Sequence, residues 1–120
     1  MEPKAGEVWL INFPFEEDLT QIKKRPGVVL DVDHEILKVL TIKVTKHKPK
    51  DYDKYDTEIF YWKEAKLKFK STARISKTML LDKDKFIHKI GDLHPDDLTD
   101  IQNKFIKFMQ NNIWNINKEK

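Results

Sequence analysis

Apolar and polar residues alternate along much of this chain, which is the pattern of β-strands whose two faces differ. The first such run covers residues 8–13, with Trp9, Ile11 and Phe13 on one face and Val8 and Leu10 on the other. Apolar residues on both faces predict a central or barrel strand rather than an exposed edge.

Further short runs of the same kind follow, separated by turn residues. Strands are predicted at residues 28–32, 39–45, 57–62 and 71–75, with a short apolar piece at 79–81. Residues 16–24 are expected to form a polar loop, and residues 84–90 a short helical segment that ends at Gly91. Many short strands with turn signals between them indicate a small β-barrel or an open half-barrel.

Two lysine-rich segments stand between these runs. Residues 46–50 form a basic loop, and residues 66–70 alternate Lys66, Lys68 and Lys70 with Leu67 and Phe69. The lysines of residues 66–70 either follow the phosphates of a nucleic acid or protect an exposed edge strand against aggregation, and both can hold together. The pattern alone leaves both interpretations open.

The last element is predicted to be a helix. Pro95 suits its first position, and Asp96 and Asp97 complement the positive end of the helix dipole. Apolar residues at helical spacing give it a core-facing stripe: Leu98, Ile101, Phe105, Phe108 and Met109. A second apolar set near its end indicates a subunit contact or a partner-docking surface, with fraying beyond residue 111 as the alternative: Ile106, Ile113, Trp114 and Ile116. Residues 117–120 are expected to be disordered.

Each of two apolar runs has a polar side chain at one end that could bind a substrate. Arg25 directly precedes the strand that Pro26 opens, and Thr45 closes the strand at 39–45. If these strands are neighbours joined by the short connection at 33–38, both side chains fall at the same end of the sheet. A permanent cation beside a hydroxyl is suited to holding a phosphate. The alternative is a surface arginine at a turn and an ordinary β-branched strand residue.

Length and composition set the class of protein. A chain of 120 residues is expected to form a single domain, with a core at about 6–111. Twenty-three Lys and Arg against 20 Asp and Glu give a net charge of +3, which permits a nucleic-acid partner without proving one. No cysteine is present, so disulfides and thiolate zinc sites are excluded. With no membrane-length apolar run and no signal-peptide core, a cytoplasmic protein is expected.

The sequence contains no pattern typical of a metal site, a phosphate-binding loop or a catalytic triad. The four histidines, His34, His47, His88 and His94, lack metal-ligand spacing, so no metal or other cofactor is expected. The chain also lacks a glycine-rich phosphate loop and a recognisable Ser-His-Asp setting.

An ordered set of segments resembles the MazF/PemK (Kid-like) toxin family of type II toxin–antitoxin systems. Residues 6–15 (GEVWLINFPF) and then 24–30 (KRPGVVL) are similar to the opening of that family, and Thr45 matches its second signature position. Residues 71–75 (STARI) resemble its third block, and 90–98 its entry to the last helix. The similarity extends from about Gly6 to Phe108. It implies an SH3-like small barrel of the MazF/Kid/CcdB type, mainly β with a C-terminal helix.

The resemblance also implies an activity and partners. Members of the family are sequence-specific endoribonucleases that cut single-stranded mRNA without metal, act as homodimers and are silenced by a cognate antitoxin. By this resemblance Arg25 and Thr45 are the catalytic pair, leaving a 2′,3′-cyclic phosphate or 3′-phosphate and a 5′-hydroxyl. Arginine is a natural stabiliser of the phosphorane because its guanidinium stays charged and binds two oxygens at once.

Several further residues are candidates at this site. The general base is open among Glu16, Glu17 and Asp18 of the first loop, with His47 a candidate by its proximity to Thr45 and its near-neutral ordinary pKa. RNA-binding or supporting roles are expected for Lys23, Lys24, Lys46, His47, Ser71 and Arg74. Tyr52 or Tyr55 either stacks on an unpaired base or covers the edge of the core.

The sequence departs from the family in one place. Arg74 matches an arginine that some relatives use at the site, but Ser76 stands where those relatives have an acid. An Arg/Asp catalytic arrangement is therefore in doubt, and Arg74 is either an RNA-phosphate contact or a strand arginine paired to a nearby acid.

Two other functions remain open from the sequence. One is a CcdB-like toxin that acts on a protein, as CcdB acts on gyrase, and that depends on C-terminal residues such as Trp114 and Ile116. The other is an inactive nucleic-acid-binding barrel that uses Lys66, Lys68 and Lys70.

Overall fold

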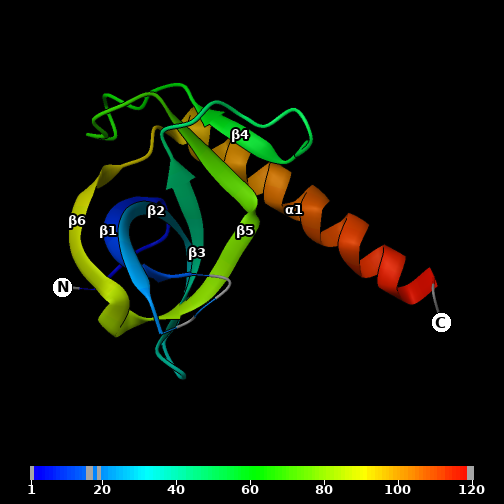
Figure 1. Cartoon of the computed structure of the whole chain (residues 1–120), viewed down its shortest axis with the longest axis horizontal. Coiled ribbons are helices and arrows are strands. Elements are labelled where there is room, and N and C mark those ends of the chain that lie inside the picture. The colour runs from blue at the N-terminus through cyan, green and yellow to red at the C-terminus, as the bar shows by residue number, and fades with distance from the viewer. Residues whose placement is uncertain (1, 16–17, 19, 119–120) are drawn as a thin grey trace.

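The structure is a computed structural model that describes residues 2–15, 18 and 20–118, with side chains described as far as residue 112. It consists of strands, one short 3-10 helix (η1) and a long C-terminal helix (Figure 1). Their bounds are β1 Glu7–Pro14, β2 Ile22–Asp33, β3 Lys38–Thr45, β4 Asp56–Ile59, β5 Ser71–Asp82, η1 Lys83–Lys85, β6 Phe86–Asp92 and α1 Pro95–Lys118.

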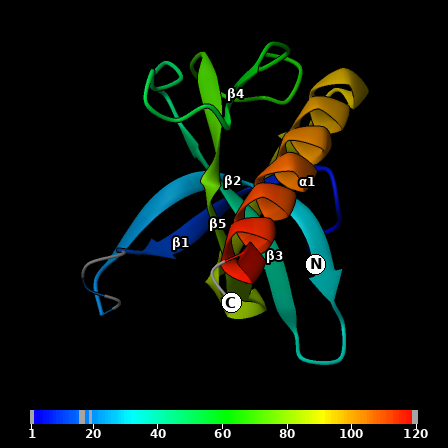
Figure 2. The same cartoon turned by 90° about the vertical axis from the view of Figure 1, so that its right-hand side faces the viewer.

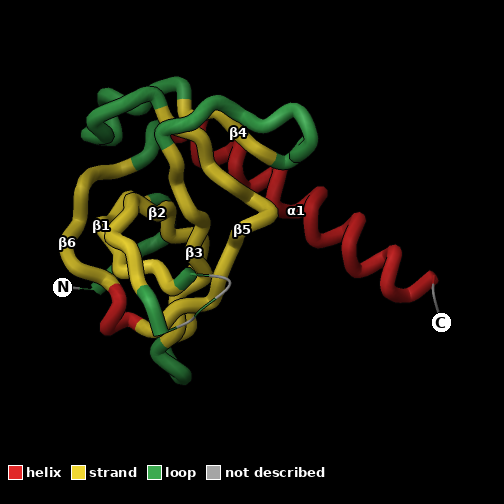
Figure 3. The backbone as a smooth tube through the Cα atoms, in the orientation of Figure 1, coloured by secondary structure: helices red, strands yellow, loops and turns green. Residues whose placement is uncertain are grey.

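The strands form one antiparallel sheet with the order β4-β5-β3-β2-β1-β6. Its strands bend around β1 and β2, as Figure 3 shows, but the edge strands β4 and β6 do not pair with each other, so the sheet is open. β1 lies between β2 and β6, which confirms the prediction of a central strand with two apolar faces. The predicted class, mainly β with a C-terminal helix, is confirmed.

Each face of the sheet carries its own apolar cluster. One cluster faces helix α1 and contains, among others, Val8, Val28, Ile42 and Ile101. The other lies on the opposite face, inside the curl of the strands, and consists of Trp9, Ile11, Phe13, Val29, Val39 and Leu81. Gly27 permits this tight curl, because a Cβ there would lie 2.6 Å from Ile11 Cδ1 and 2.9 Å from Phe13 Cζ.

Helix α1 is fixed to the sheet at its N-terminal half. Asp97 is 2% exposed, and its carboxylate accepts hydrogen bonds from the N–H groups of Phe60 (3.1 Å) and Tyr61 (2.9 Å). The predicted apolar stripe packs on the sheet except for Met109, which is 38% exposed. The helix then extends beyond β5 and away from the sheet (Figures 1 and 2). Ile106 is 52% exposed, and the side chains of Ile113, Trp114 and Ile116 lie outside the described part.

The predicted loop at 16–24 was too long. Strand β2 begins at Ile22, and Arg25 lies within it, opposite Ile11 of β1, rather than before it. Pro26 is tolerated because the ladder to β3 begins only at Gly27, so Pro26 is paired on one side alone. Residues 16, 17 and 19 lie outside the described part.

The predicted helical segment at 84–90 was wrong. Only η1 is helical there, and β6 follows it as the partner of β1, with Phe86 packed edge-to-face on Trp9. Gly91 ends no helix. It allows a close approach of the chain, because a Cβ there would lie 2.3 Å from the carbonyl oxygen of Ala65.

The strand predicted at residues 57–62 was too long. Strand β4 ends at Ile59 because the next two N–H groups bond to Asp97 and not to a strand. Residues 66–70 are not a strand, because Lys66 has a left-handed backbone (φ 64°) that breaks the alternation. Leu67 is buried while Phe69 is exposed, so these two apolar side chains do not share one buried side as strict alternation predicts. The apolar piece at 79–81 belongs to β5, which is one continuous strand.

No helix among the described residues is long and apolar enough to cross a membrane.

Candidate functional site

The sheet brings Arg25 and Thr45 to one face and one end. Lys43 of β3 pairs with Gly27 of β2, and residues opposite each other in an antiparallel ladder point to the same face. Arg25 and Thr45 each lie two residues beyond that pair, in the same direction. Because a strand repeats every two residues, both share the face of Lys43. The expectation that they fall at the same end of the sheet is confirmed.

The same face continues onto β5. Lys43 pairs there with Arg74, and Thr45 pairs with Thr72. Two cationic side chains and two hydroxyls thus follow Arg25 across the sheet. Lys43 and Thr72 were not singled out from the sequence, although the two-residue spacing from Lys43 to Thr45 already placed Lys43 on the face in question.

Arg25 is a half-buried cation whose charge no described residue neutralises. Its side chain forms neither an ion pair nor a hydrogen bond with any residue that the structure describes. Lys23 and Lys24, which precede it on β2, are exposed. This end of the sheet therefore offers positive charge toward solvent, as an anion-binding surface requires.

Thr45 is held in place by the turn that follows it. It is 8% exposed, and its Oγ1 accepts a hydrogen bond from the N–H of His47 at 3.3 Å. Thr72, only 1% exposed, donates from its Oγ1 to the carbonyl oxygen of His47 at 2.7 Å. Both hydroxyls thus fix the backbone of His47, whose side chain is exposed beside the site.

Arg74 is paired with acids, which is the second of the two interpretations drawn from the sequence. Its Nε lies 2.7 Å from Asp56 Oδ1, and its Nη2 lies 3.4 Å from Asp53 Oδ2. The side chain of Asp56 is fully buried, and Asp53 also accepts a short hydrogen bond from the hydroxyl of Ser76. Arg74 therefore anchors residues 53–56 to β5, and a contact with RNA would require it to share or leave these carboxylates.

Of the remaining RNA-binding candidates, Ser71 is buried and Lys46 is exposed. Ser71 is buried on the face of the first cluster, two residues from Ala73, and its hydroxyl donates to the carbonyl oxygen of Phe69 at 2.6 Å. Lys46 is exposed at the end of β3, with its ammonium 5.5 Å from the centre of the Phe69 ring. Ser71 therefore lies off the face of Arg25 and Thr45, whereas Lys46 adds positive charge next to Thr45.

The two tyrosines of the 51–56 segment differ. Tyr55 packs edge-to-face on Phe108, and its hydroxyl accepts a hydrogen bond from Asn111 Nδ2 at 2.7 Å. It covers the edge of the core, as the second interpretation had it. Tyr52 is 82% exposed.

The general-base candidates of the first loop are described only in part. Glu16 and Glu17 lie outside the described residues. Asp18 accepts hydrogen bonds from the hydroxyl of Thr20 (2.6 Å) and from its N–H (3.0 Å), and these bonds lower the pKa of its carboxyl below the ordinary value of 3.8. A lowered pKa makes Asp18 a weaker base.

Hydrogen bonding also determines the ionisation of Asp53. Burial alone would raise the pKa of its carboxyl, but the hydroxyl of Ser76, the N–H of Tyr55 and the guanidinium of Arg74 outweigh burial, so its pKa lies below the ordinary value of 3.8. Near that pH the folded chain then binds fewer protons at Asp53 than the unfolded chain does. The stability that Asp53 contributes is complete above about pH 4 and is lost as the pH falls through the lowered pKa.

We therefore expect an acid-dependent loss of stability that Asp53→Asn reduces. Urea denaturation between about pH 7 and pH 3 should show a free energy of unfolding that falls more steeply in the wild type than in Asp53→Asn. Asp51→Asn, at an exposed position of the same segment, is the matched control and should follow the wild type. Parallel profiles for the wild type and Asp53→Asn would contradict the assignment.

No group of three or more His, Asp or Glu side chains comes together as a metal site within the described part of the chain.

The fold is similar to that of several proteins of known structure. MazF from Deinococcus radiodurans superposes with a TM-score of 0.71 at 18% identity, over 91% of this chain and 97% of that one. A mycobacterial protein described as an endoribonuclease superposes with a TM-score of 0.65 at 13% identity, over 89% and 90%. A mycobacterial endoribonuclease in complex with its cognate antitoxin gives 0.65 at 11% identity, over 88% and 92%. No functionally curated protein matches the sequence.

The sequence itself identifies the family. The family model of PemK-like, MazF-like toxins matches residues 4–109, which include both Arg25 and Thr45. Because this match covers most of the chain, the protein belongs to the PemK-like, MazF-like toxin family of type II toxin–antitoxin systems.

Proposed function

We propose that this protein is an endoribonuclease toxin that cuts single-stranded RNA at a short sequence, without a metal ion, at the face that carries Arg25 and Thr45. The observation that carries the proposal is the position of Arg25. In a chain of this toxin family, it lies on the same face and at the same end of the sheet as Thr45, and no described residue neutralises its charge.

The reaction is attack of the ribose 2′-oxygen on the adjacent phosphorus. The 2′-O–P bond forms and the P–O5′ bond breaks, which leaves a 2′,3′-cyclic phosphate and a 5′-hydroxyl. A base takes the proton of the 2′-hydroxyl, and the leaving 5′-oxygen gains a proton from an acid or from water. Glu16, Glu17, Asp18 and His47 remain the candidates for the base.

Arg25 binds the non-bridging oxygens, where negative charge grows in the transition state. Thr45 donates its hydroxyl hydrogen to the phosphate while its oxygen accepts from the N–H of His47, so the turn after β3 orients it. Lys43 adds positive charge beside both residues on the same face.

The proposal includes the binding partners of the protein. The chain acts in the cytoplasm as a homodimer, so that one RNA groove draws on two subunits, and a cognate antitoxin silences it. Two comparisons support a protein partner: MazF of Deinococcus radiodurans has been described with MazE, and the mycobacterial endoribonuclease has been described with its antitoxin.

Cleavage of a long single-stranded RNA in EDTA tests the proposal. Wild-type protein should cut the RNA and leave 5′-hydroxyl ends, which a polynucleotide kinase labels directly. Thr45→Val, which keeps the shape but lacks the hydroxyl, should lower kcat/KM by about 10- to 100-fold, because one hydrogen bond to a charged group is lost. Thr45→Ser should retain most of the activity.

Three outcomes would count against this site or activity. RNA that stays intact with folded wild-type protein, across several substrates, would reject the nuclease and favour a binding toxin. Cleavage that needs a divalent ion would reject the metal-free mechanism. Full activity of Thr45→Val would keep the enzyme and reject the role of Thr45.

A further inference from the structure

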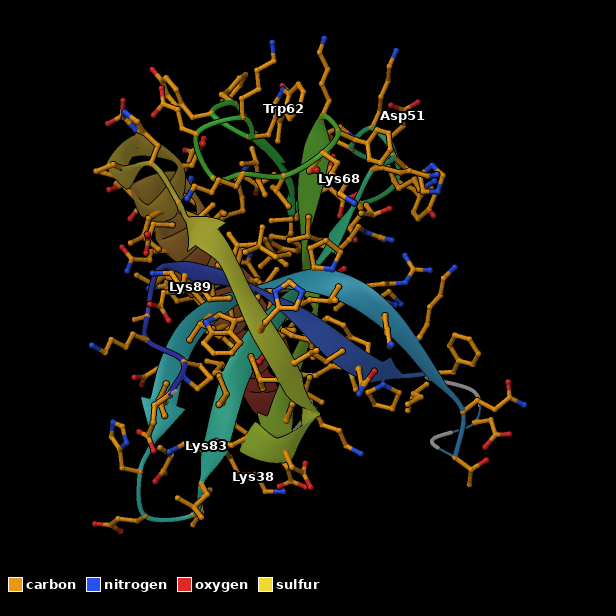
Figure 4. All side chains as sticks on the ribbon, turned by 90° about the vertical axis from the view of Figure 1, so that its left-hand side faces the viewer. Lys38, Asp51, Trp62, Lys68, Lys83 and Lys89 are labelled. Atoms are coloured by element: carbon orange, nitrogen blue, oxygen red, sulfur yellow. The ribbon has the colours of Figure 1, made fainter. Side chains whose placement is uncertain are left out.

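The structure joins two lysine-rich loops that lie far apart in the sequence. Residues 46–50 (KHKPK) follow β3, and residues 66–70 (KLKFK) precede β5. One contact joins the loops directly, because the ammonium of Lys46 lies 5.5 Å from the centre of the Phe69 ring. In addition, Thr72 of β5, two residues after the second loop, donates from its hydroxyl to the carbonyl oxygen of His47 in the first. Figure 4 shows Asp51 and Lys68 at the same end of the molecule, opposite Lys38 and Lys83.

Phe69 is an exposed aromatic ring at the centre of this region. It is 58% exposed, although Leu67, two residues before it, is buried. The hydroxyl of Ser71 holds the backbone of Phe69 through its carbonyl oxygen at 2.6 Å. A single exposed apolar side chain needs no functional explanation. Here, however, the backbone of Phe69 is held by Ser71, the ammonium of Lys46 lies over the ring, and Lys68 and Lys70 flank it in the sequence.

The Phe69 ring lies close in the fold to Thr45 of the candidate site. Lys46, which contacts Phe69, directly follows Thr45, and Thr72, three residues after Phe69, pairs with Thr45. An RNA strand whose phosphate lies at Thr45 would therefore run onto the two loops as it continues past the end of β3. Lysines bind its phosphates without regard to sequence, and an aromatic ring stacks on an unpaired base.

We propose that Phe69 is a stacking platform for an unpaired RNA base next to the scissile phosphate, with Lys46, Lys68 and Lys70 binding the adjacent backbone. The inference rests on the proposed function and adds a residue that sets how the substrate is bound. It also keeps the first of the two interpretations of residues 66–70, phosphate binding, because these residues are not an edge strand in need of protection.

Binding of an oligonucleotide that cannot be cut tests the platform apart from catalysis. The probe is a labelled strand of about twelve 2′-deoxyuridines, compared with a strand of the same length whose sugars carry no bases. Phe69→Ala should weaken binding of the uridine strand by roughly 5- to 150-fold and leave binding of the abasic strand unchanged. Phe69→Trp should restore the affinity. Lys68→Ala should weaken both strands and reduce the salt dependence.

Phe60→Ala is the matched control, since Phe60 is 64% exposed and also lies between β4 and β5, but no cation of the described residues lies over its ring. It should bind both strands as the wild type does. Equal affinity of Phe69→Ala and Phe60→Ala for the uridine strand, or an equal loss on both strands in Phe69→Ala, would overturn the platform. Wild-type protein that binds neither strand would overturn it as well.

Cleavage of long RNA in EDTA, measured on the same variants, separates this inference from the proposed function. RNA cut equally well by the wild type and by Phe69→Ala would leave the nuclease standing and remove the platform. Base-dependent binding that requires Phe69, without any cleavage, would retain the platform and remove the nuclease.

Discussion

Arg25→Ala is expected to lower kcat for RNA cleavage by about 10²- to 10³-fold, with little change in the folded structure. The size follows from the loss of one charged donor to an oxyanion in the transition state. The fold should survive because the Arg25 side chain has neither an ion pair nor a hydrogen bond to any described residue, and its partner in β1 is Ile11, which other contacts hold. Single-turnover cleavage with saturating enzyme would measure the chemical step directly.

Arg25→Lys separates charge from geometry. Lysine keeps the positive charge but binds a phosphate at one point instead of two, so its activity should lie between those of the wild type and Arg25→Ala. Lys85→Ala, a change of the same charge in η1 at the other end of the sheet, is the matched control and should cut RNA normally. If Arg25→Ala cut as fast as Lys85→Ala, Arg25 would not stabilise the transition state.

Alternation was sufficient to predict the central part of the fold. Apolar residues on both faces of residues 8–13 predicted a central strand, and β1 lies between β2 and β6 with an apolar cluster on each face. Thr45 and Arg25 could be placed at one end from strand pairing alone. Residues 84–90 show where the pattern was insufficient: β6 has register shifts against β1, so its apolar residues do not alternate strictly.

Long-range contacts account for most of what the sequence could not show. From the sequence, Asp97 was expected only to complement the dipole of the helix. In the structure its carboxylate also accepts hydrogen bonds from the N–H groups of Phe60 and Tyr61, 37 and 36 residues away, and β4 ends there. Arg74 likewise looks equally suited to RNA or to an acid, and only the folded chain brings Asp53 and Asp56 to it. Side-chain partners far apart in the sequence leave no local periodicity to read.

Asp56→Ala is expected to lower the free energy of unfolding by about 3–5 kcal/mol, because it leaves the guanidinium of Arg74 without its nearer carboxylate in a buried position. The side chain of Asp56 is fully buried and that of Arg74 is 15% exposed. Asp56 Oδ2 also accepts the N–H of Lys50 at 2.9 Å, so the loop after β3 loses an anchor as well. Urea denaturation at neutral pH would measure the loss.

The pair can be tested as a unit because both partners can be removed together. Arg74→Ala alone leaves the carboxylates of Asp53 and Asp56 without their cation and should also be costly, whereas the double variant Asp56→Ala/Arg74→Ala should lose clearly less stability than the two single losses added. Glu58→Ala, at an exposed position of the same strand, is the control and should cost less than about 0.5 kcal/mol. Additive losses would mean that Asp56 and Arg74 stabilise the fold independently. Such a result would free Arg74 for a direct contact with RNA, and the anchoring of residues 53–56 to β5 would then need another source.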